Sequence, residues 1–284
     1  MKKIFIFIIT VVLCMLQACK YDSFNSKNSD KQNGKDTDTV HIAILPVNES
    51  EPLRYAQQNG IFDSLGISVS LDTFMAAMDA DTAFINGKAQ FIITDSIKAK
   101  YLTSLCLSLG DSDSVYSIIT DTLELSLMTA NTARIRNLKS LKEKIIAVTR
   151  NSAIDYSADK ILQSAQLKKE ELNRPQINNI ELRAQMLNLS QYDGAILPEP
   201  FATQCEEMGA YRLHTIKEPI LVLLTRNKYI KNNKEISLIK KAYERGKQLY
   251  LVDKRKQIAA KRKAEAQSDN NNGTRKNTNK NNIR

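Results

Sequence analysis

Four segments of the chain, at 46–50, 94–96, 149–152 and 197–200, join the end of an apolar run to the start of a helical pattern and carry polar side chains. The first backbone N–H groups of a helix have no partner within the helix, and open α/β sheets bind ligands beyond the carboxyl ends of their strands. We therefore expect the four segments to meet at one pocket with fixed hydrogen-bonding groups. Capped helix starts also occur without a pocket, and no single segment is a specific motif.

Catalytic and metal-binding patterns are absent from the sequence. The body of the chain holds two histidines, His41 and His214, and two cysteines, Cys106 and Cys205, and none of them has the spacing of metal ligands. There is no Ser/His/Asp arrangement and no phosphate-binding loop. We therefore predict no catalytic residue, no metal and no cofactor, and we expect the two cysteines to be free thiols.

Short apolar runs alternate with helical patterns from Val40 onward, which is typical of an α/β fold with βαβ units and parallel sheets. The expected strands span 40–46, 67–73, 90–94, 115–120, 124–129, 144–149, 176–182, 193–197 and 220–225. The expected helices span 51–59, 79–86, 96–105, 139–142, 153–166, 184–190, 201–208 and 235–252. These elements must position the four polar segments.

The N-terminus has the three parts of a secretory signal, with Lys2 and Lys3 before a mainly apolar run and a small-residue ending. That ending, Leu16-Gln17-Ala18-Cys19, resembles a bacterial lipobox, which implies cleavage after residue 18 and a lipid such as palmitate on Cys19. A transmembrane anchor is the alternative, but the run is shorter than the ~20 residues of a spanning helix. We predict a signal peptide at 1–18, a flexible tether at 19–39, and a lipid-anchored protein on the cell membrane that faces the periplasm or the cell exterior.

The net charge of +10 lies at the ends of the chain. Residues 254–284 contribute a net charge of +8 and the predicted signal at 1–18 contributes +2, so the body at 19–253 has no net charge. The fold thus lacks the basic footprint of a nucleic-acid-binding protein, and we predict no nucleic acid as a partner. The segment 261–284, rich in Asn, Lys and Arg, is expected to be a disordered basic tail.

Seven segments in order resemble one family of transport proteins. They are Ile44-Leu45-Pro46-Val47, Asn59-Gly60-Ile61-Phe62, Asn137-Leu138-Lys139-Ser140-Leu141-Lys142, Asp193-Gly194-Ala195-Ile196-Leu197-Pro198-Glu199-Pro200, and the residues at 83–88, 93–95 and 146–152. From about Val40 to Leu251 the chain is similar to ABC-transporter solute-binding proteins of the nitrate/sulfonate/taurine/thiamine-precursor group. These are type II periplasmic binding proteins.

The resemblance implies an α/β fold of two lobes joined by crossover hinge strands, with the ligand between the lobes. Lobe I would comprise 40–122 and 222–260, and lobe II 123–221. The implied function is capture of a small organic or anionic nutrient, sulfonate-like or thiamine-precursor-like, for an ABC importer. The implied partners are the ligand, the ABC permease and ATPase subunits, and the membrane through the lipid anchor. We expect a monomer.

The resemblance also transfers ligand-binding positions to this chain. They are Val47, Asn48, Thr94, Asp95, Arg150, Asn151, Ser152 and Glu199. Asn151, Ser152 and free N–H groups suit polar or anionic ligand atoms. Arg150 suits either a bidentate clamp on a carboxylate or sulfonate or an ion pair elsewhere on the protein. The acids Glu49, Asp95 and Glu199 instead favour a ligand with N–H donors, such as an aminopyrimidine.

Two other classes of function remain as alternatives. One is an anchored ligand sensor or scaffold without a transporter. The other is an enzyme, because relatives of this fold catalyse steps of menaquinone and thiamine-pyrimidine synthesis. The menaquinone enzymes are cytoplasmic, which the signal contradicts, and the pyrimidine synthases use a Cys- and His-bearing site that this sequence lacks. We therefore predict a protein that is not an enzyme.

Overall fold

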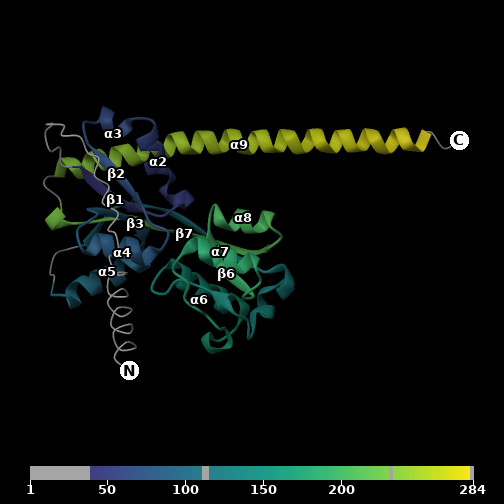
Figure 1. Cartoon of the computed structure of the whole chain (residues 1–284), viewed down its shortest axis with the longest axis horizontal. Helices are drawn as coiled ribbons and strands as arrows, with labels where there is room; N and C mark the ends of the chain where they lie inside the picture. The colour runs from purple at the N-terminus through teal and green to yellow at the C-terminus, as the bar shows by residue number, and fades with distance from the viewer. Residues whose placement is uncertain (1–38, 111–114, 230–232, 282–284) are drawn as a thin grey trace, which may run out of the picture. The chain divides into compact units, whose positions relative to one another are not determined.

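The computed structural model describes residues 39–110, 115–229 and 233–281. The predicted signal peptide, Cys19 and nearly all of the predicted tether lie outside these residues. The described residues belong to one compact unit, and Figure 1 shows its strands and helices.

One mixed sheet of seven strands forms the centre of the fold, in the order β2-β1-β3-β7-β4-β6-β5. Neighbouring strands are parallel in the pairs β1–β2, β1–β3 and β5–β6, and antiparallel in the other three pairs. The strands are β1 (Val40–Ile44), β2 (Val69–Thr73), β3 (Phe91–Asp95), β4 (Val115–Thr129), β5 (Ile146–Ala147), β6 (Gly194–Pro198) and β7 (Tyr211–Arg226).

Helices cover both faces of the sheet in each of its two halves, which we call lobe I and lobe II. Lobe I carries α2 (Glu51–Gln58), α3 (Ile61–Ser64), α4 (Ala77–Ile85), α5 (Ser96–Ser108) and α9 (Asn233–Asn281), and lobe II carries α6 (Ala153–Ala165), α7 (Ile180–Asn188) and α8 (Phe201–Glu207). Short 3-10 helices are η1 (Asn48–Ser50), η2 (Asn131–Ala133), η3 (Leu138–Leu141), η4 (Lys169–Glu171) and η5 (Asn227–Tyr229).

Each lobe has two apolar clusters, one on each face of its part of the sheet. In lobe I, α2, α3 and α9 pack around Ile42 and Leu223, and α4 and α5 pack around Ile92 and Leu224. In lobe II the corresponding clusters form around Leu197 and Ile196. Each lobe therefore has a core of its own, and the two cores are joined through the sheet.

The long strands β4 and β7 pair with each other from Val115–Arg226 to Thr129–Tyr211 and pass from one lobe into the other. The sequence predicts two strands, at 115–120 and 124–129, separated by polar residues, and this is wrong. The chain stays extended because the register shifts between Asp121 and Leu123, and the Asp121 carboxylate accepts from the Tyr243 hydroxyl at 2.8 Å. The expected strand at 220–225 covers only the last part of β7.

The expected strand at 176–182 is also wrong, since residues 176–179 form a loop and residues 180–182 form the first turn of α7. Only single bridges occur here, Val148 with Gln176 and Ala76 with Asn179. The Asn179 side chain accepts from the N–H of Leu182 at 2.9 Å and caps the helix. An Asn side chain favours such a cap over a place within a strand.

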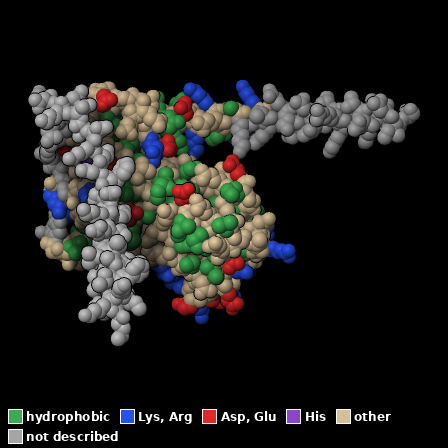
Figure 2. All heavy atoms as spheres, viewed as in Figure 1, with side chains coloured by type: hydrophobic (Ala, Val, Ile, Leu, Met, Phe, Trp, Pro, Cys, Tyr) green, Lys and Arg blue, Asp and Glu red, His purple; other side chains and the backbone are tan. Residues whose placement is uncertain are grey.

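Helix α9 runs beyond its expected end at 252, and its backbone is helical to Asn281, through most of the segment expected to be disordered (Figure 1). Residues 254–267 consist mainly of Lys, Arg, Ala, Glu and Gln, which are strong helix formers. Figure 2 shows Lys and Arg side chains along its described part. No helix in the described part of the chain has the length and apolar character that a membrane span requires.

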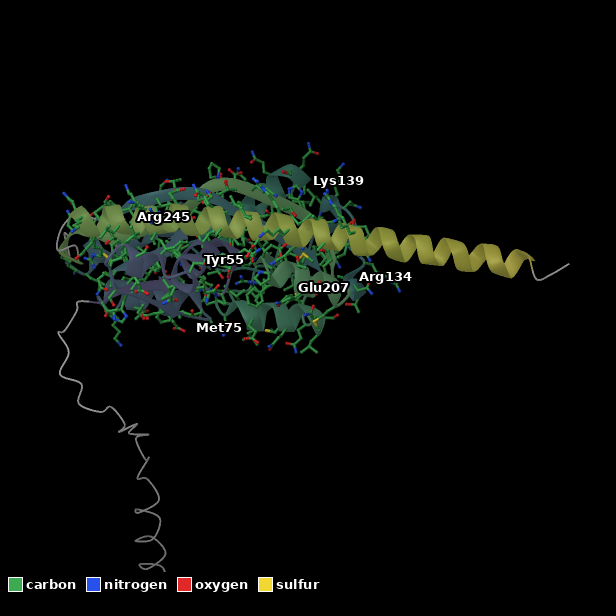
Figure 3. All side chains as sticks on the ribbon, turned by 90° about the horizontal axis from the view of Figure 1, so that it is seen from above. Tyr55, Met75, Arg134, Lys139, Glu207 and Arg245 are labelled. Carbon is green, nitrogen blue, oxygen red and sulfur yellow. The ribbon has the colours of Figure 1, made fainter. Side chains whose placement is uncertain are left out.

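The first half of α9 packs closely on α2. The rings of Tyr55 and Tyr250 lie 5.6 Å apart, and Tyr55 is seen beneath α9 in Figure 3. At Gly246 a Cβ atom would overlap the carbonyl oxygen of Pro52 and lie 2.9 Å from the backbone nitrogen of Ala56. The two helices therefore need glycine at this position.

We expect Gly246→Ala to lower the free energy of unfolding by about 1–3 kcal/mol, because backbone must shift to admit the methyl group. Gln248→Ala, at an exposed position of the same helix, is the control and should change stability by less than ~0.5 kcal/mol. Urea unfolding measures both. Equal stability of the two variants would contradict the packing described here.

Candidate functional site

A cavity of about 90 Å³ lies between the two lobes, beside the crossover strands. Lobe I contributes residues from β3, from the segment after β1 and from the start of α4, and lobe II contributes residues from the starts of α6 and α7. The lining is mainly apolar, and its members are Leu45, Val47, Glu49, Ala77, Ile93, Thr94, Asp95, Lys98, Leu123, Leu125, Thr149, Ser152, Ala153, Ile154, Ile180, Pro198 and Leu221.

The lobes are joined across the cleft by backbone hydrogen bonds. The N–H of Asn48 in lobe I donates to the carbonyl of Glu199 in lobe II at 2.8 Å. The N–H of Ile180 in lobe II donates to the carbonyl of Met75 in lobe I at 3.1 Å. These contacts join segments that follow strand ends, so the cleft is closed over the cavity.

Asp95 ends β3, and its carboxylate caps the following helix. Its Oδ1 accepts from the N–H of Ile97 at 2.9 Å and from the N–H of Lys98 at 2.8 Å. Burial raises the pKa of the Asp95 carboxyl, and backbone hydrogen bonds from Lys98, Ala153 and Ile97 oppose that shift. Because Ala153 opens α6, the Asp95 carboxylate meets the starts of two helices, one in each lobe.

The lobe II side of the cavity begins with Thr149 and Ser152. The hydroxyl of Ser152 donates to the carbonyl of Thr149 at 2.6 Å and accepts from the N–H of Ile154 at 3.2 Å, so it is the cap of α6. The hydroxyl of Thr149 accepts from Nη1 of Arg183 at 2.6 Å. The polar groups on this side are therefore held in position by hydrogen bonds.

Arg183 lies behind this wall, on α7, and is fully buried. Its Nη1 also donates to the carbonyl of Ile177 at 2.7 Å, whereas Nε and Nη2 have no hydrogen-bond partner. Burial lowers the pKa of its guanidinium to about 10. The charge of Arg183 thus acts on the cavity through the Thr149 hydroxyl, because Arg183 itself is not among the lining residues.

Lys98 is the cationic member of the cavity lining, and its charge is already paired. Its Nζ lies 3.1 Å from Oδ2 of Asp81, and both side chains are buried. Burial raises the pKa of Asp81, and the charge of Lys98 opposes the shift. Removing either partner would leave a buried charge without compensation.

Glu49 extends from η1 toward the crossover strands. Its Oε1 accepts from the N–H of Glu124 at 3.4 Å, and its buried Oε2 has no hydrogen-bond partner. Burial raises the pKa of Glu49 from 4.5 to about 7, backbone hydrogen bonds oppose the shift, and the charges of Glu124 and Glu199 add to it. Glu49 thus has one carboxyl oxygen, Oε2, that lacks a donor within the cleft.

A second cavity of about 250 Å³ adjoins Glu49 and is lined by residues of α9, β4 and β7, together with Asn48 and Glu199. Its acids are largely paired: Glu199 with Arg212 at 2.7 Å, and Glu124 with Lys217 at 2.9 Å. Asp121 is paired in the same way with Lys247 at 2.6 Å. Glu49 lines both cavities.

The structure brings six of the eight expected ligand-binding residues to these cavities. Val47, Thr94, Asp95 and Ser152 line the interlobe cavity, and Asn48 and Glu199 line the second one. Arg150 and Asn151 are exposed and lie outside both linings. Arg150 donates from Nη2 to the carbonyl of Arg174 at 3.0 Å, so its guanidinium is used within lobe II.

Two polar residues of the site were not predicted, Lys98 and Arg183. Thr149 belongs to the expected pocket segment 149–152 but was not among the expected ligand-binding residues. Lys98 stands three residues after Asp95, one helical turn along the face of α5, and that spacing was a usable signal. Arg183 gives no such signal, because an arginine on a helix is usually exposed. Among the described residues no three His, Cys, Asp or Glu side chains are grouped to hold a metal ion.

Solved structures with this fold include periplasmic binding proteins. The chain is similar to the nitrate-binding protein NrtA from Synechocystis PCC 6803 (TM-score 0.66, 12% identity, over 75% of this chain and 62% of that one). It is also similar to the alkanesulfonate-binding protein SsuA from Xanthomonas axonopodis pv. citri, bound to MOPS (TM-score 0.63, 13% identity, over 76% of this chain and 75% of that one). A third similar structure is the ligand-binding component of an ABC-type import system from Staphylococcus aureus (TM-score 0.61, 14% identity, over 73% of each chain).

These likenesses define the fold as that of a type II periplasmic binding protein, as the sequence predicts. Residues 48–254 match the model of one family, described as NMT1/THI5 like, and the chain belongs to that family. No curated protein matches the chain.

We expect Glu49→Gln to stabilise the protein at pH 8 by about 1–3 kcal/mol and to have little effect near pH 4.5. Since the folded-state pKa of Glu49 is about 7, above the ordinary 4.5, the folded protein retains this proton where the unfolded chain has lost it. The stability that the proton contributes is present at low pH and is lost as pH rises through 7. Urea unfolding at both pH values measures the difference.

Glu207→Gln, at an exposed position of α8, is the control (Figure 3) and should show little pH dependence relative to the unmodified protein. An equal effect of Glu49→Gln at pH 4.5 and pH 8 would show that Glu49 titrates normally in the folded state.

Proposed function

We propose that this protein is the extracytoplasmic solute-binding component of an ABC importer and that it holds a small ligand between its two lobes. The observation that carries this proposal is the interlobe cavity, whose lining comes from both lobes and from the strands that join them. Membership of the NMT1/THI5 like family supports it. So does the fold that the chain shares with nitrate- and alkanesulfonate-binding proteins.

The mechanism that we propose is closure of the lobes around the ligand by bending of β4 and β7. Lobe I would comprise 40–122 and 222–260, and lobe II 123–221. In the open state the ligand reaches the cavity wall on one lobe, and closure then forms the backbone bonds Asn48–Glu199 and Ile180–Met75. The closed surface, made of both lobes, is what a permease would recognise, and the permease works with an ATPase.

The ligand contacts that we propose follow the cavity lining. Val47, Thr94, Asp95 and Ser152 would contact the ligand, and Asn48 and Glu199 would lie at the edge of the site. In this role the protein binds and does not catalyse, acts as a monomer, and needs neither a cofactor nor nucleic acid. A sulfonate-like or a thiamine-precursor-like nutrient is the ligand class that the sequence indicates.

A thermal-shift screen of sulfonates, nitrate, amino acids, aminopyrimidines and other vitamin precursors tests the binding function. We expect at least one compound to stabilise the protein, by about 2.7 kcal/mol at 100 times its Kd. Thr94→Leu, which adds apolar bulk at the cavity wall, should abolish that shift. Thr82→Leu, at an exposed position of α4, should retain it. A ligand that stabilises the two variants equally would bind elsewhere.

The anchor that we propose is a lipid on Cys19, and radiolabelled palmitate tests it in the bacterial host. Cys19→Ala should lose the label and leave the membrane fraction, because the cysteine of the lipobox is missing. Cys14→Ala, within the predicted signal peptide, is the matched control and should keep the label. A Cys19→Ala protein that stays labelled would refute the lipid site.

A further inference from the structure

The interlobe cavity has a negative balance of charge. Three charged side chains line it: Glu49, Asp95 and Lys98. The charge of Lys98 is paired at 3.1 Å with Asp81, outside the lining. Two carboxyl groups therefore face the cavity with no cation left for a ligand, and the rest of the lining is mainly apolar.

The place where an anion would bind is already taken by the protein. Backbone N–H groups at a helix start attract negative charge. The start of α6 faces the cavity through Ser152, Ala153 and Ile154. Asp95 from lobe I interacts with the Ala153 N–H while it caps α5 through Ile97 and Lys98. A ligand carboxylate or sulfonate would have to displace the Asp95 carboxylate or lie beside it.

The Glu49 carboxyl group, unlike that of Asp95, lacks a hydrogen-bond donor for one of its oxygens. Its Oε2 is buried and without a hydrogen-bond partner, although Glu49 lines the cavity. A buried acceptor without a donor is costly, so a ligand N–H that reaches Oε2 would recover a charge-assisted hydrogen bond. The positive Arg183 does not reverse this preference, because it lies behind Thr149 and outside the lining.

We propose that the interlobe cavity binds a small amine with an apolar body, that the ammonium group donates to Glu49, and that small anions are excluded. This inference rests on the proposed function, since it narrows the ligand class of the same site, and it excludes the sulfonate-like alternative. The size follows from the cavity: an apolar cavity of about 150 Å³ holds benzene, so about 90 Å³ suits a ligand smaller than benzene, of roughly four or five non-hydrogen atoms.

Isothermal titration of the purified protein with n-butylammonium, butyrate and nitrate tests the proposal. The first two each have four carbon atoms in an unbranched chain and differ in charge, and nitrate is a smaller anion that controls for size. We expect n-butylammonium to bind and to raise Tm, and we expect neither anion to bind detectably. Binding of butyrate or nitrate as tight as that of n-butylammonium would overturn the proposal.

Two variants assign the effect to the named groups. Glu49→Gln keeps the shape of the side chain and should weaken the binding of n-butylammonium at least tenfold. The surface variant Glu207→Gln should leave that affinity unchanged. Asp95→Asn keeps a good helix cap and removes the charge at the start of α6, so it should admit butyrate. Equal n-butylammonium affinity in the unmodified protein and in Glu49→Gln would contradict the role of Glu49.

Failure of this inference and failure of the proposed function give different results. If n-butylammonium does not bind, the amine site is refuted, whether or not the anions bind. If a compound of the wider screen still stabilises the protein and loses its effect in Thr94→Leu, the solute-binding function stands. If no compound binds at all, both proposals fail.

Discussion

The antiparallel pairing of β4 with β7 is the interaction on which the rest of the structure depends. It runs from Val115–Arg226 to Thr129–Tyr211, joins β3 on one side and β6 on the other, and makes one sheet of the two lobes. Each lobe completes most of its core against this pair, and Leu45 and Val47, from the segment after β1, also pack into an apolar cluster of lobe II. Register shifts occur after Ser117, Asp121 and Leu127. Bulges bend and twist a strand locally, so the pair has positions where the relative orientation of the lobes can change without loss of the ladder.

Burial of charge dominates the chemistry of the cleft. Lys98 with Asp81 forms a paired set, and the Asp95 carboxylate is satisfied by backbone N–H groups. Glu49 and Arg183 are the exceptions, since each retains a buried polar atom without a partner. Unpaired buried polar groups lower stability. They are found here next to the cavity, where a bound molecule can complete their hydrogen bonding.

Much of the fold follows from pattern in the sequence. The alternation of apolar runs and helical patterns predicts the α/β class, and the caps Asp95 and Ser152 mark the starts of α5 and α6. The errors lie where long-range contacts outweigh local preference. Asp121 looks like a turn residue but remains in β4, because Tyr243 and Lys247 from α9 bind its carboxylate. The apolar residues at 176–182 suggest a strand, yet Asn179 begins a helix there.

The expected site residues divide in the same way between local signals and long-range packing. Asp95 and Ser152 could be found because a helix cap leaves a local signal, and Glu49 was recognised as an acid near the cleft. Arg150 was expected at the cavity from its position in a motif, but the backbone turns it outward, with Asn151 next to it at a positive φ of 54°. Arg183 could not be found, because its burial depends on the packing of α7 against the rest of lobe II.

The bonds that close the cleft, Asn48 to Glu199 and Ile180 to Met75, join backbone groups, whereas the cavity is lined by side chains. Substitution of a lining side chain changes what the cavity can hold but leaves the donors and acceptors of closure in place. Closure and recognition are therefore separable by mutation. A binding protein built in this way can acquire a new solute in the course of evolution while it continues to present the same closed face to its transporter.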